Sequence, residues 1–277
     1  MRRPKVGVAG IRDYAGLAAL FAALACNAPA IAQKLPSAET SSAASSTPDF
    51  TGVFITITPA EFKAGGPTKR KGPPPRPIAA SPLGDGSQGR SPNAPKLTPE
   101  YMAKWEAIRK SRMAASAEYD NNAKCLPPGM PAMMSAVYGN RLEVMQTKNK
   151  ITFFTEVNDS LRRVYLDGRK PSERVLNDPT YPGYSTGHWE NDTLVIDTVA
   201  LRDNTFIDEE FTPHSEAMTV HERIRYLTSD VWEDKIAVTD PVALTEPWEV
   251  TKLYLRQKPG TDELRETVCP EGLADAK

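Results

Sequence analysis

The sequence predicts a mainly β protein, in which an antiparallel meander closes into a barrel or a strongly curled sheet, with one packed N-terminal helix. From residue 142 onward, short segments with alternating apolar side chains follow one another, and turn residues such as Asn-Asp-Ser separate them. No helical pattern lies between these segments, which disfavours parallel βαβ units. About eight antiparallel strands must bury one face and protect their edges, and closure or curling achieves both. A sandwich of two sheets is the alternative.

The first residues of the chain predict export from the cytoplasm. A basic start precedes the apolar residues 15–25, which are too few to span a bilayer. Small residues then form a cleavage site that ends at Ala32. We therefore expect residues 1–32 to be a secretory signal peptide and the mature protein to be periplasmic or secreted. The alternative is a lipoprotein in which Cys26 carries the lipid, although the residues before Cys26 fit that pattern poorly.

Two low-complexity segments flank the first predicted strand. Residues 33–48 are rich in Ser, Ala and Thr and predict a flexible leader, and the strand follows in PDFTGVFITI. Residues 64–96 are rich in proline and glycine and can bury too little apolar surface to offset the entropy of ordering, so we expect a disordered insertion. Residues 49–277 are consistent with a single β-rich domain that carries this insertion.

A helix is predicted directly after the insertion. Thr98 is a suitable N-cap, and Pro99 occupies the first helical position, where its missing N–H has no intrahelical partner to lose. The apolar residues at helical spacing are Tyr101, Trp105 and Ile108. We therefore expect a helix that ends near Ala117 and packs Trp105 on the β core.

The rest of the chain is assigned to strands by its period-two pattern. Before these strands, CLPPGMP combines three prolines with a glycine and predicts a rigid, non-helical passage. The predicted strands, in chain order, are LEVMQT, KITFFTEV, LRRVYLDG, TLVIDTVAL, EAMTVHERIRYL, VWEDKIAVTD, WEVTKLYLRQ and ELRETVC.

Two cysteines, Cys125 and Cys269, remain once the expected signal peptide is removed. An even number of cysteines in an exported chain predicts one disulfide between them. Such a bond would close a long loop and, by the chain-entropy argument, stabilise the fold by about 4–5 kcal/mol. The alternative is a pair of free, buried thiols.

Charge and motifs exclude several functions. The chain carries 34 basic and 35 acidic side chains, a formal net charge of −1, which is not the electrostatic footprint of a nucleic-acid-binding protein. After the signal peptide, no stretch is long and apolar enough for an integral membrane span. Walker, dinucleotide and G-x-S-x-G motifs are missing, as is metal-ligand spacing such as H-E-x-x-H, so we expect neither a cofactor nor a metal. A small molecule is the expected partner.

One candidate site lies in TPHSEAMTVHERIRYL. If this segment is a strand, Glu222 lies on its apolar face, whereas His221 points to the other side. A buried carboxylate needs a partner, or its pKa rises. We expect partners in Arg163 and Tyr165 of LRRVYLDG, and a further polar group in Asp197. This cluster could orient a ligand or make Glu222 a general acid or base, and the alternative is a structural ion pair.

A second candidate is His214, which precedes the same strand and follows an acidic loop. His214 and one of the loop carboxylates could form an acid–base pair at the mouth of a barrel. The loop carboxylates are Asp203, Asp208, Glu209 and Glu210. The alternative is a solvated acidic loop that ends in a histidine. Trp189, just before a hairpin turn, is a candidate ligand platform and otherwise a core residue.

Six motifs within residues 48–269 form a specific set: PDFTGVF, LTPE, CLPPGMP, LRRVYLDGR, GHWENDTLVIDT and PHSEAMTVHER. Together they resemble a widespread family of secreted bacterial proteins that are β-rich and have no established activity. This sequence departs from the family where Phe54 replaces a frequent Trp, Tyr184 a histidine and His188 an arginine. A lipocalin-like barrel follows from fold-level analogy alone. The resemblance places any shared site at Arg163, Tyr165, Asp197, His214 and Glu222.

These observations favour three hypotheses about function. The first is a binding protein that holds a small, partly apolar molecule inside the barrel, with apolar walls for affinity and the polar cluster for orientation. The second is a cofactor-independent enzyme, a lyase, isomerase or hydrolase, that uses Glu222 or His214 for proton transfer. The third is a structural envelope protein whose core is filled and has no cavity.

Overall fold

The computed structural model describes most of the β-rich part of the chain, namely residues 47–65, 90–114, 124, 126–134, 141–260 and 263–265. Four predictions fall wholly or largely outside these residues. They concern the signal peptide at 1–32, the leader at 33–48, residues 66–89 of the insertion and the disulfide between Cys125 and Cys269.

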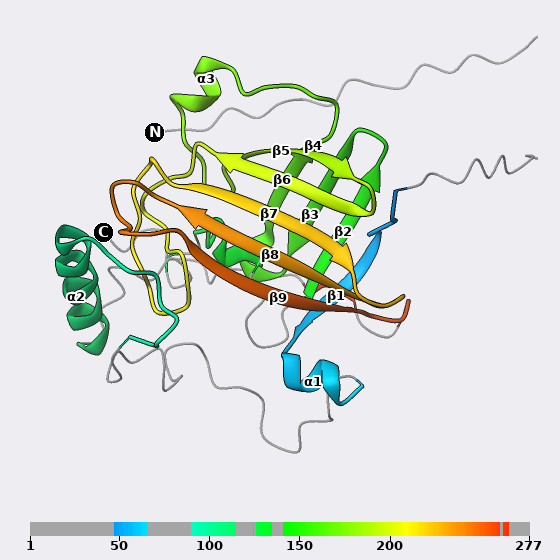
Figure 1. Cartoon of the computed structure of the whole chain (residues 1–277), viewed down its shortest axis with the longest axis horizontal. Coiled ribbons are helices and arrows are strands. Elements are labelled where there is room, and N and C mark those ends of the chain that lie inside the picture. The colour runs from blue at the N-terminus through cyan, green and yellow to red at the C-terminus, as the bar shows by residue number, and fades with distance from the viewer. Residues whose placement is uncertain are drawn as a thin grey trace, which may run out of the picture. The chain divides into compact units, whose positions relative to one another are not determined.

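The described chain forms a closed β-barrel of nine strands (Figure 1). Each strand pairs with its neighbours in sequence, and β9 pairs with β1 to close the sheet. The mainly β fold class and the closure into a barrel are thus confirmed. The strands are β1 (Gly52–Ile57), β2 (Arg141–Thr147), β3 (Lys150–Thr155), β4 (Ser160–Tyr165), β5 (Tyr184–Glu190), β6 (Thr193–Val199), β7 (Thr219–Tyr226), β8 (Val231–Thr239) and β9 (Trp248–Arg256).

One strand pair departs from the expected meander, because β4 and β5 run parallel, with Val164 opposite Ser185. The connection between them, residues 166–183, contains the short helix α3 (Glu173–Leu176) and returns the chain to the end at which β4 begins. The prediction of a purely antiparallel meander is therefore wrong at this pair. A connection of this length permits a parallel crossover, whereas short hairpin turns enforce antiparallel pairing.

Strand β5 is missing from the predicted strands, because YSTGHWE lacks a clear apolar alternation. Its inward positions include Ser185 and Gly187. A Cβ atom at Gly187 would lie 2.9 Å from the carbonyl oxygen of Val195 and 3.0 Å from a methyl group of Val164, so glycine permits the close approach of β5 to its neighbours. Conversely, residues 263–265 of the predicted strand ELRETVC are not in a strand, and the remainder of that segment lies outside the described residues.

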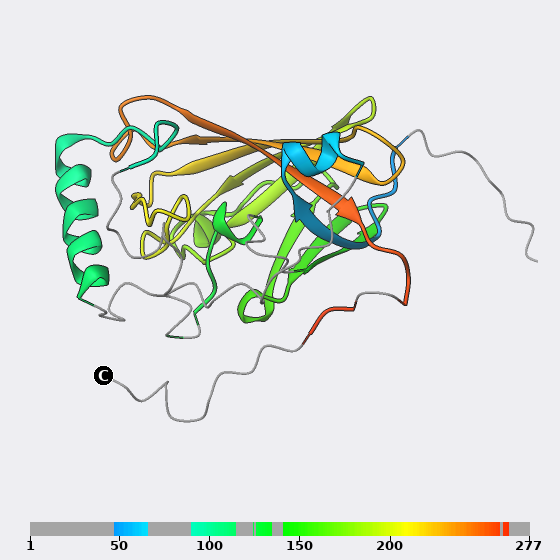
Figure 2. The ribbon, with the colours of Figure 1, turned by 90° about the horizontal axis from the view of Figure 1, so that it is seen from below.

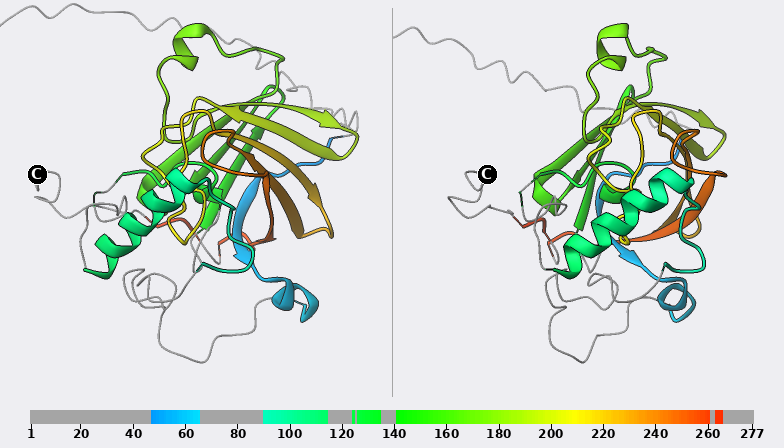
Figure 3. Two further views of the ribbon diagram at one scale, coloured as in Figure 1. Left: turned by 60° about the vertical axis from the view of Figure 1, so that its left-hand side comes forward. Right: turned by 90° about the vertical axis from the view of Figure 1, so that its left-hand side faces the viewer.

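Helix α2 (Pro99–Met113) confirms the predicted helix and crosses one end of the barrel (Figure 3). The Thr98 hydroxyl does not cap the helix but donates to the carbonyl of Val242, 3.2 Å away, which attaches the helix start to the β8–β9 connection. The helix ends at Met113, before the expected Ala117, which lies outside the described residues. Its buried residues are the three predicted ones, Tyr101, Trp105 and Ile108.

The shorter helix α1 (Pro59–Lys63) follows directly after β1 (Figure 2). It begins with a reciprocal cap, in which Thr58 Oγ1 accepts from the Glu61 N–H at 3.1 Å and the Glu61 carboxylate accepts from the Thr58 N–H at 2.7 Å. Phe62 then packs on a small apolar cluster, separate from the main core, that is formed by Ile57, Val231 and Leu253. In the described part of the chain, no helix is both long enough and apolar enough to cross a membrane.

Large side chains fill the interior of the barrel. Trp232 stacks on Tyr254 with ring centroids 3.8 Å apart, and it meets Phe54 in an edge contact at 5.5 Å. The Tyr254 hydroxyl donates to the carbonyl of Met134. Other large side chains that are fully buried are Arg162, Phe50, Phe153, Met130, Met133, Met134, Leu142, Ile151 and Leu194. Such an interior is a packed core, as expected where a small barrel is filled by its own side chains.

The last residues of the predicted insertion make contacts with the barrel. The Nε1 atom of Trp248 on β9 donates to the carbonyl of Asn93 at 2.6 Å. The Lys96 ammonium group lies 2.8 Å from the Glu246 carboxylate. Residues 90–96, which belong to the segment expected to be disordered, thereby carry the chain along the barrel to the start of α2.

Candidate functional site

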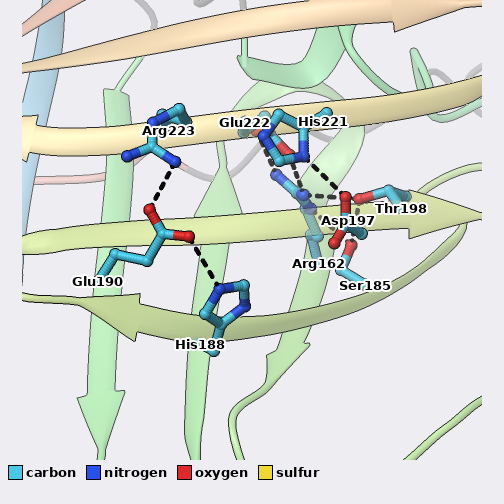
Figure 4. Close-up of polar contacts among 9 residues, drawn as sticks. All are labelled: Arg162, Ser185, His188, Glu190, Asp197, Thr198, His221, Glu222 and Arg223. Atoms are coloured by element: carbon cyan, nitrogen blue, oxygen red, sulfur yellow. Dashed lines mark hydrogen bonds and ion pairs between the residues drawn. The ribbon is translucent and has the colours of Figure 1, made fainter.

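A charged cluster occupies the barrel interior (Figure 4). Arg162 on β4 forms a bidentate ion pair with Glu222 on β7, in which Nη1 donates to Oε1 at 2.8 Å and Nη2 donates to Oε2. The Arg162 side chain is 1% exposed and that of Glu222 is 0% exposed. Arg162 Nε also donates to Ser185 Oγ at 3.0 Å, and Nη2 donates to Thr198 Oγ1 at 2.9 Å. Each guanidinium nitrogen therefore has a partner, as a buried charge requires.

Strand pairing brings these groups together from four strands. Val164, which shares the inward side of β4 with Arg162, lies opposite Ser185 in the parallel pair, and Ser185 lies opposite Thr198 on β6. The two hydroxyl groups are 2.8 Å apart. Glu222 comes from the next strand, β7, and points to the same interior. The parallel crossover, which sequence patterns did not predict, thus places Ser185 where it accepts a hydrogen bond from the guanidinium.

A second carboxyl group, Asp234 on β8, accompanies the ion pair and is fully buried. Neither of its oxygens accepts a hydrogen bond from a described donor. Burial, and then the negative charge of Glu222, raise the pKa of Asp234 well above its usual range, while Arg162 and Lys252 oppose the shift. The raised pKa favours the neutral, protonated form of Asp234, because burial penalises the charged form. In that form Asp234 adds no charge to the interior, and the opposite charges of Arg162 and Glu222 balance each other.

The partner of Glu222 is thus Arg162, and the prediction of Arg163 and Tyr165 as its partners is wrong. Arg163 is exposed on the outer face of β4. Tyr165 lies on that same face, where it packs on Tyr184 with ring centroids 5.3 Å apart. Side chains alternate between the two faces of a strand. Arg162 and Arg163 are adjacent and therefore face opposite sides, so selecting Arg163 placed all the predicted partners of Glu222 on the outer face.

Asp197 lies on the outer face of the barrel rather than in the interior cluster (Figure 4). It stands opposite His221 in the β6–β7 pairing and accepts a hydrogen bond from His221 Nδ1 at 2.7 Å. Glu190 similarly contacts His188 at 3.3 Å and Arg223 at 2.8 Å. All these side chains are largely exposed, so water screens their interactions and they form a solvated outer face. The structure thus corrects the placement of Asp197 and agrees with the outward orientation expected for His221.

His214 lies shortly before β7 and is only 2% exposed. Its Nδ1 atom donates to the carbonyl of Ser215 at 2.9 Å, and its Nε2 atom accepts from the Thr205 hydroxyl at 2.7 Å. Burial lowers the pKa of His214, so the imidazole is neutral at pH 7. The expected acid–base pair with a loop carboxylate does not occur among the described contacts. The carboxylate of Asp208, for example, accepts from the N–H of Thr212 at 3.0 Å instead.

A pocket of about 530 Å³ lies at the end of the barrel, between α2 and the loop at residues 201–214. Figure 3 shows α2 crossing in front of this loop. His214 contributes to the lining from the loop side. The apolar residues of the lining are Ala107, Ile108, Leu126, Phe206 and Pro213. Its polar and charged residues are Tyr101, Lys104, Lys124, Asp203 and Asn204.

The loop wall of the pocket is held in place by contacts on both of its sides. Trp105 Nε1 on α2 donates to the carbonyl of Glu210 at 2.9 Å. Behind the wall, Gly129 adopts a left-handed backbone with φ of 76°, and a Cβ atom there would lie 2.6 Å from Thr205 Cγ2. Glycine is therefore required for the chain to pass so close to Thr205, which also holds His214. These contacts fix the loop wall of the pocket.

Trp189 lies on the inner side of β5 and packs parallel to Phe50, with ring centroids 6.0 Å apart. It is a partly buried member of the core and is not part of the pocket lining. The core alternative therefore describes Trp189 better than the alternative of a ligand platform.

Sequence reasoning missed Asp234 and the two hydroxyl groups that contact Arg162. Asp234 occupies the buried side of β8, VWEDKIAVT, together with Trp232 and Ile236. A carboxyl group among apolar residues is the same signal that marked Glu222, so Asp234 could have been found. Ser and Thr carry no comparable signal, because a small hydroxyl side chain occurs on either face of a strand.

Fold and site together define a class of protein: a closed β-barrel with a packed interior that contains buried charges, and with a small pocket beneath a helix at one end. Among the described residues, no group of three or more His, Cys, Asp or Glu is placed to hold a metal ion. No model of a known protein family matches the chain, and no curated protein matches it in sequence.

Proposed function

We propose that the protein binds a small, partly apolar molecule in the pocket between α2 and residues 201–214. The observation that carries this proposal is the pocket itself, which combines apolar walls with a few polar groups. Its volume of about 530 Å³ falls within the range of roughly 300–1,000 Å³ that is usual for small-molecule sites. The proposed ligand site thereby moves from the barrel interior, where the sequence suggested it, to the end of the barrel.

The barrel interior is poorly suited to a ligand. Trp232 and Tyr254 occupy it, and Arg162 and Glu222 are bonded to one another and sealed from solvent. A ligand would have to displace these side chains and separate a buried ion pair, at a cost of about 3–5 kcal/mol. The ion pair is better explained as part of the scaffold.

The geometry disfavours catalysis by the two groups considered for proton transfer. A general acid or base must come within hydrogen-bonding reach of its substrate. Glu222 has no exposed surface, and both of its oxygens are engaged with Arg162. His214 uses both ring nitrogens within the protein. We therefore favour binding over an enzymatic function for this site.

We also propose that the protein acts outside the cytoplasm, in the periplasm or as a secreted protein. The support comes from the sequence, in which a basic start, the apolar residues 15–25 and a small-residue cleavage site follow one another. Membership of the family of secreted, β-rich bacterial proteins is a proposal of the same kind, based on the motif set. Export would give such a protein access to small molecules of the cell envelope.

A variant with a filled pocket tests the proposed binding. Ala107→Trp places a large side chain in the pocket lining, whereas Ala103→Trp adds the same side chain at an exposed position of α2 outside the lining. Full-length protein is titrated with the fluorescent apolar probe N-phenyl-1-naphthylamine. We expect saturable binding by the wild type and by Ala103→Trp, and about tenfold weaker binding or none by Ala107→Trp. Equal affinity of the three proteins, or no binding by the wild type, would refute the proposal.

A further inference from the structure

We infer that the ligand is a dipolar molecule with an apolar body, an anionic group that faces α2 and a cationic group that faces the loop, as in an apolar amino acid. This inference rests on the proposed function, because it concerns the same pocket. Its basis is that side chains of opposite charge contribute to the two walls of the pocket, one wall from α2 and the other from residues 201–214.

The wall formed by α2 presents an ammonium group. Lys104 belongs to the lining, and its Nζ atom lies 3.9 Å from the centre of the Tyr101 ring and 2.9 Å from the Glu100 carboxylate. The hydrogen bond with Glu100 raises the pKa of Lys104, so the group is charged at neutral pH. An ammonium group has three N–H donors, and one contact with Glu100 leaves donors for a ligand carboxylate. Lys124 adds a second basic side chain to the lining.

The opposite wall presents a carboxylate. Asp203 belongs to the lining, and its side chain forms no hydrogen bond or ion pair with any residue that the structure describes. His214 on the same wall is neutral and uses its ring nitrogens elsewhere, so it does not compensate the charge of Asp203. A ligand ammonium group would give Asp203 a charge-assisted hydrogen bond, which is stronger than a bond between neutral groups.

The remainder of the lining suits an apolar body. Ile108 on α2, Phe206 on the loop and Leu126 provide aliphatic and aromatic surface. An apolar side chain gains free energy when it is buried there, while the two charges fix its orientation. A singly charged ligand is disfavoured, because an anion would approach Asp203 and a cation would approach Lys104. Such repulsion against the wrong ligand is a common source of specificity.

Four probes that share the same apolar side chain measure the contribution of each ligand charge to the affinity. L-phenylalanine is dipolar, N-acetyl-L-phenylalanine is anionic, L-phenylalanine amide is cationic and N-acetyl-L-phenylalanine amide is neutral. Calorimetric titration of the full-length protein should give the highest affinity for L-phenylalanine and about tenfold weaker binding for each blocked form. Equal affinity for the four probes, or a preference for a singly charged one, would overturn the inference.

Two substitutions assign each charge to its wall. Asp203→Asn should weaken binding of L-phenylalanine about tenfold and should not weaken binding of the N-acetyl acid, because the acid lacks the ammonium group and is repelled by Asp203. Lys104→Gln should weaken binding of L-phenylalanine similarly and should not weaken binding of the amide, because the amide lacks the carboxylate and is repelled by Lys104. Lys110→Gln is the matched control, since Lys110 is exposed on α2 and is not part of the lining. A uniform effect of Asp203→Asn on all four probes would contradict the assignment.

The naphthylamine titration separates failure of this inference from failure of the proposed function. If the naphthylamine binds, Ala107→Trp abolishes its binding and the phenylalanine probes show no preference for the dipole, the pocket binds another class of molecule and the inference is overturned. If the naphthylamine does not bind either, the proposed function fails as well.

Discussion

Replacement of Arg162 by leucine tests whether the buried ion pair organises the barrel. The substitution removes four side-chain hydrogen bonds, two of them to Glu222, and leaves that carboxylate buried without its cation. Removal of one partner of a buried pair costs about 3–5 kcal/mol, because the remaining charge is uncompensated. For a domain of this size, that loss corresponds to a decrease in Tm on the order of 10 °C.

Urea denaturation followed by tryptophan fluorescence measures the loss, since Trp232 is fully buried in the same interior. Arg163→Leu is the matched control on the same strand. Arg163 is exposed, so its replacement should change the free energy of unfolding by less than about 0.5 kcal/mol. The double variant Arg162→Leu/Glu222→Leu should recover most of the loss, because no charge remains unpaired. Equal effects of the two arginine substitutions, or a cost below about 1 kcal/mol for Arg162→Leu, would refute the reasoning.

Two further predictions concern the buried acid and the support of the loop wall. Because the pKa of Asp234 is raised in the folded state, its contribution to stability is complete below the ordinary carboxyl range and is lost as the pH rises toward the raised value. Urea denaturation at several pH values should show this decline, of at most about 1.4 kcal/mol per pH unit, and Asp234→Asn, which imitates the neutral acid, should flatten it. An unchanged pH profile would contradict the protonated state. Gly129→Ala should lower Tm more than Gly168→Ala: φ is 76° at Gly129 and 75° at Gly168, but only at Gly129 would the new methyl group clash with Thr205. Equal losses in thermal denaturation would argue against the close packing of the loop wall.

Local sequence signals were sufficient to predict helix α2 and most strands. The helix start depends on Pro99 and on the spacing of apolar residues within a few turns, all of which are short-range properties. Strand β5 could not be predicted from its apolar pattern, because Ser185 and Gly187 occupy inward positions. Contacts with other strands explain both residues: Ser185 accepts a hydrogen bond from the guanidinium of Arg162, and Gly187 permits the close approach of adjacent strands. The sequence around β5 does not show these contacts.

The buried acid could be predicted, whereas its partner could not. Glu222 stood out because a carboxylate among apolar residues is anomalous within a single strand. The choice between Arg162 and Arg163 depends on which side of β4 faces inward. The turn that precedes β4 contains Asn158 and Asp159 in left-handed conformations, with φ of 49° and 45°, and such a turn sets the register of the strand that follows.

The sequence by itself determined a mainly β fold of short alternating strands, a helix with a defined apolar face and a carboxylate in the core, and only the structure decided that the sheet closes. These three features follow from the periodicity of apolar residues and from the free energy of burying apolar or charged side chains. Both signals can be read from a few neighbouring residues. Only the tertiary structure decided that the pocket lies at the end of the barrel, between Lys104 on one wall and Asp203 on the other. A pocket is formed where two segments distant in the sequence pack imperfectly against each other, and no pattern within either segment records that geometry.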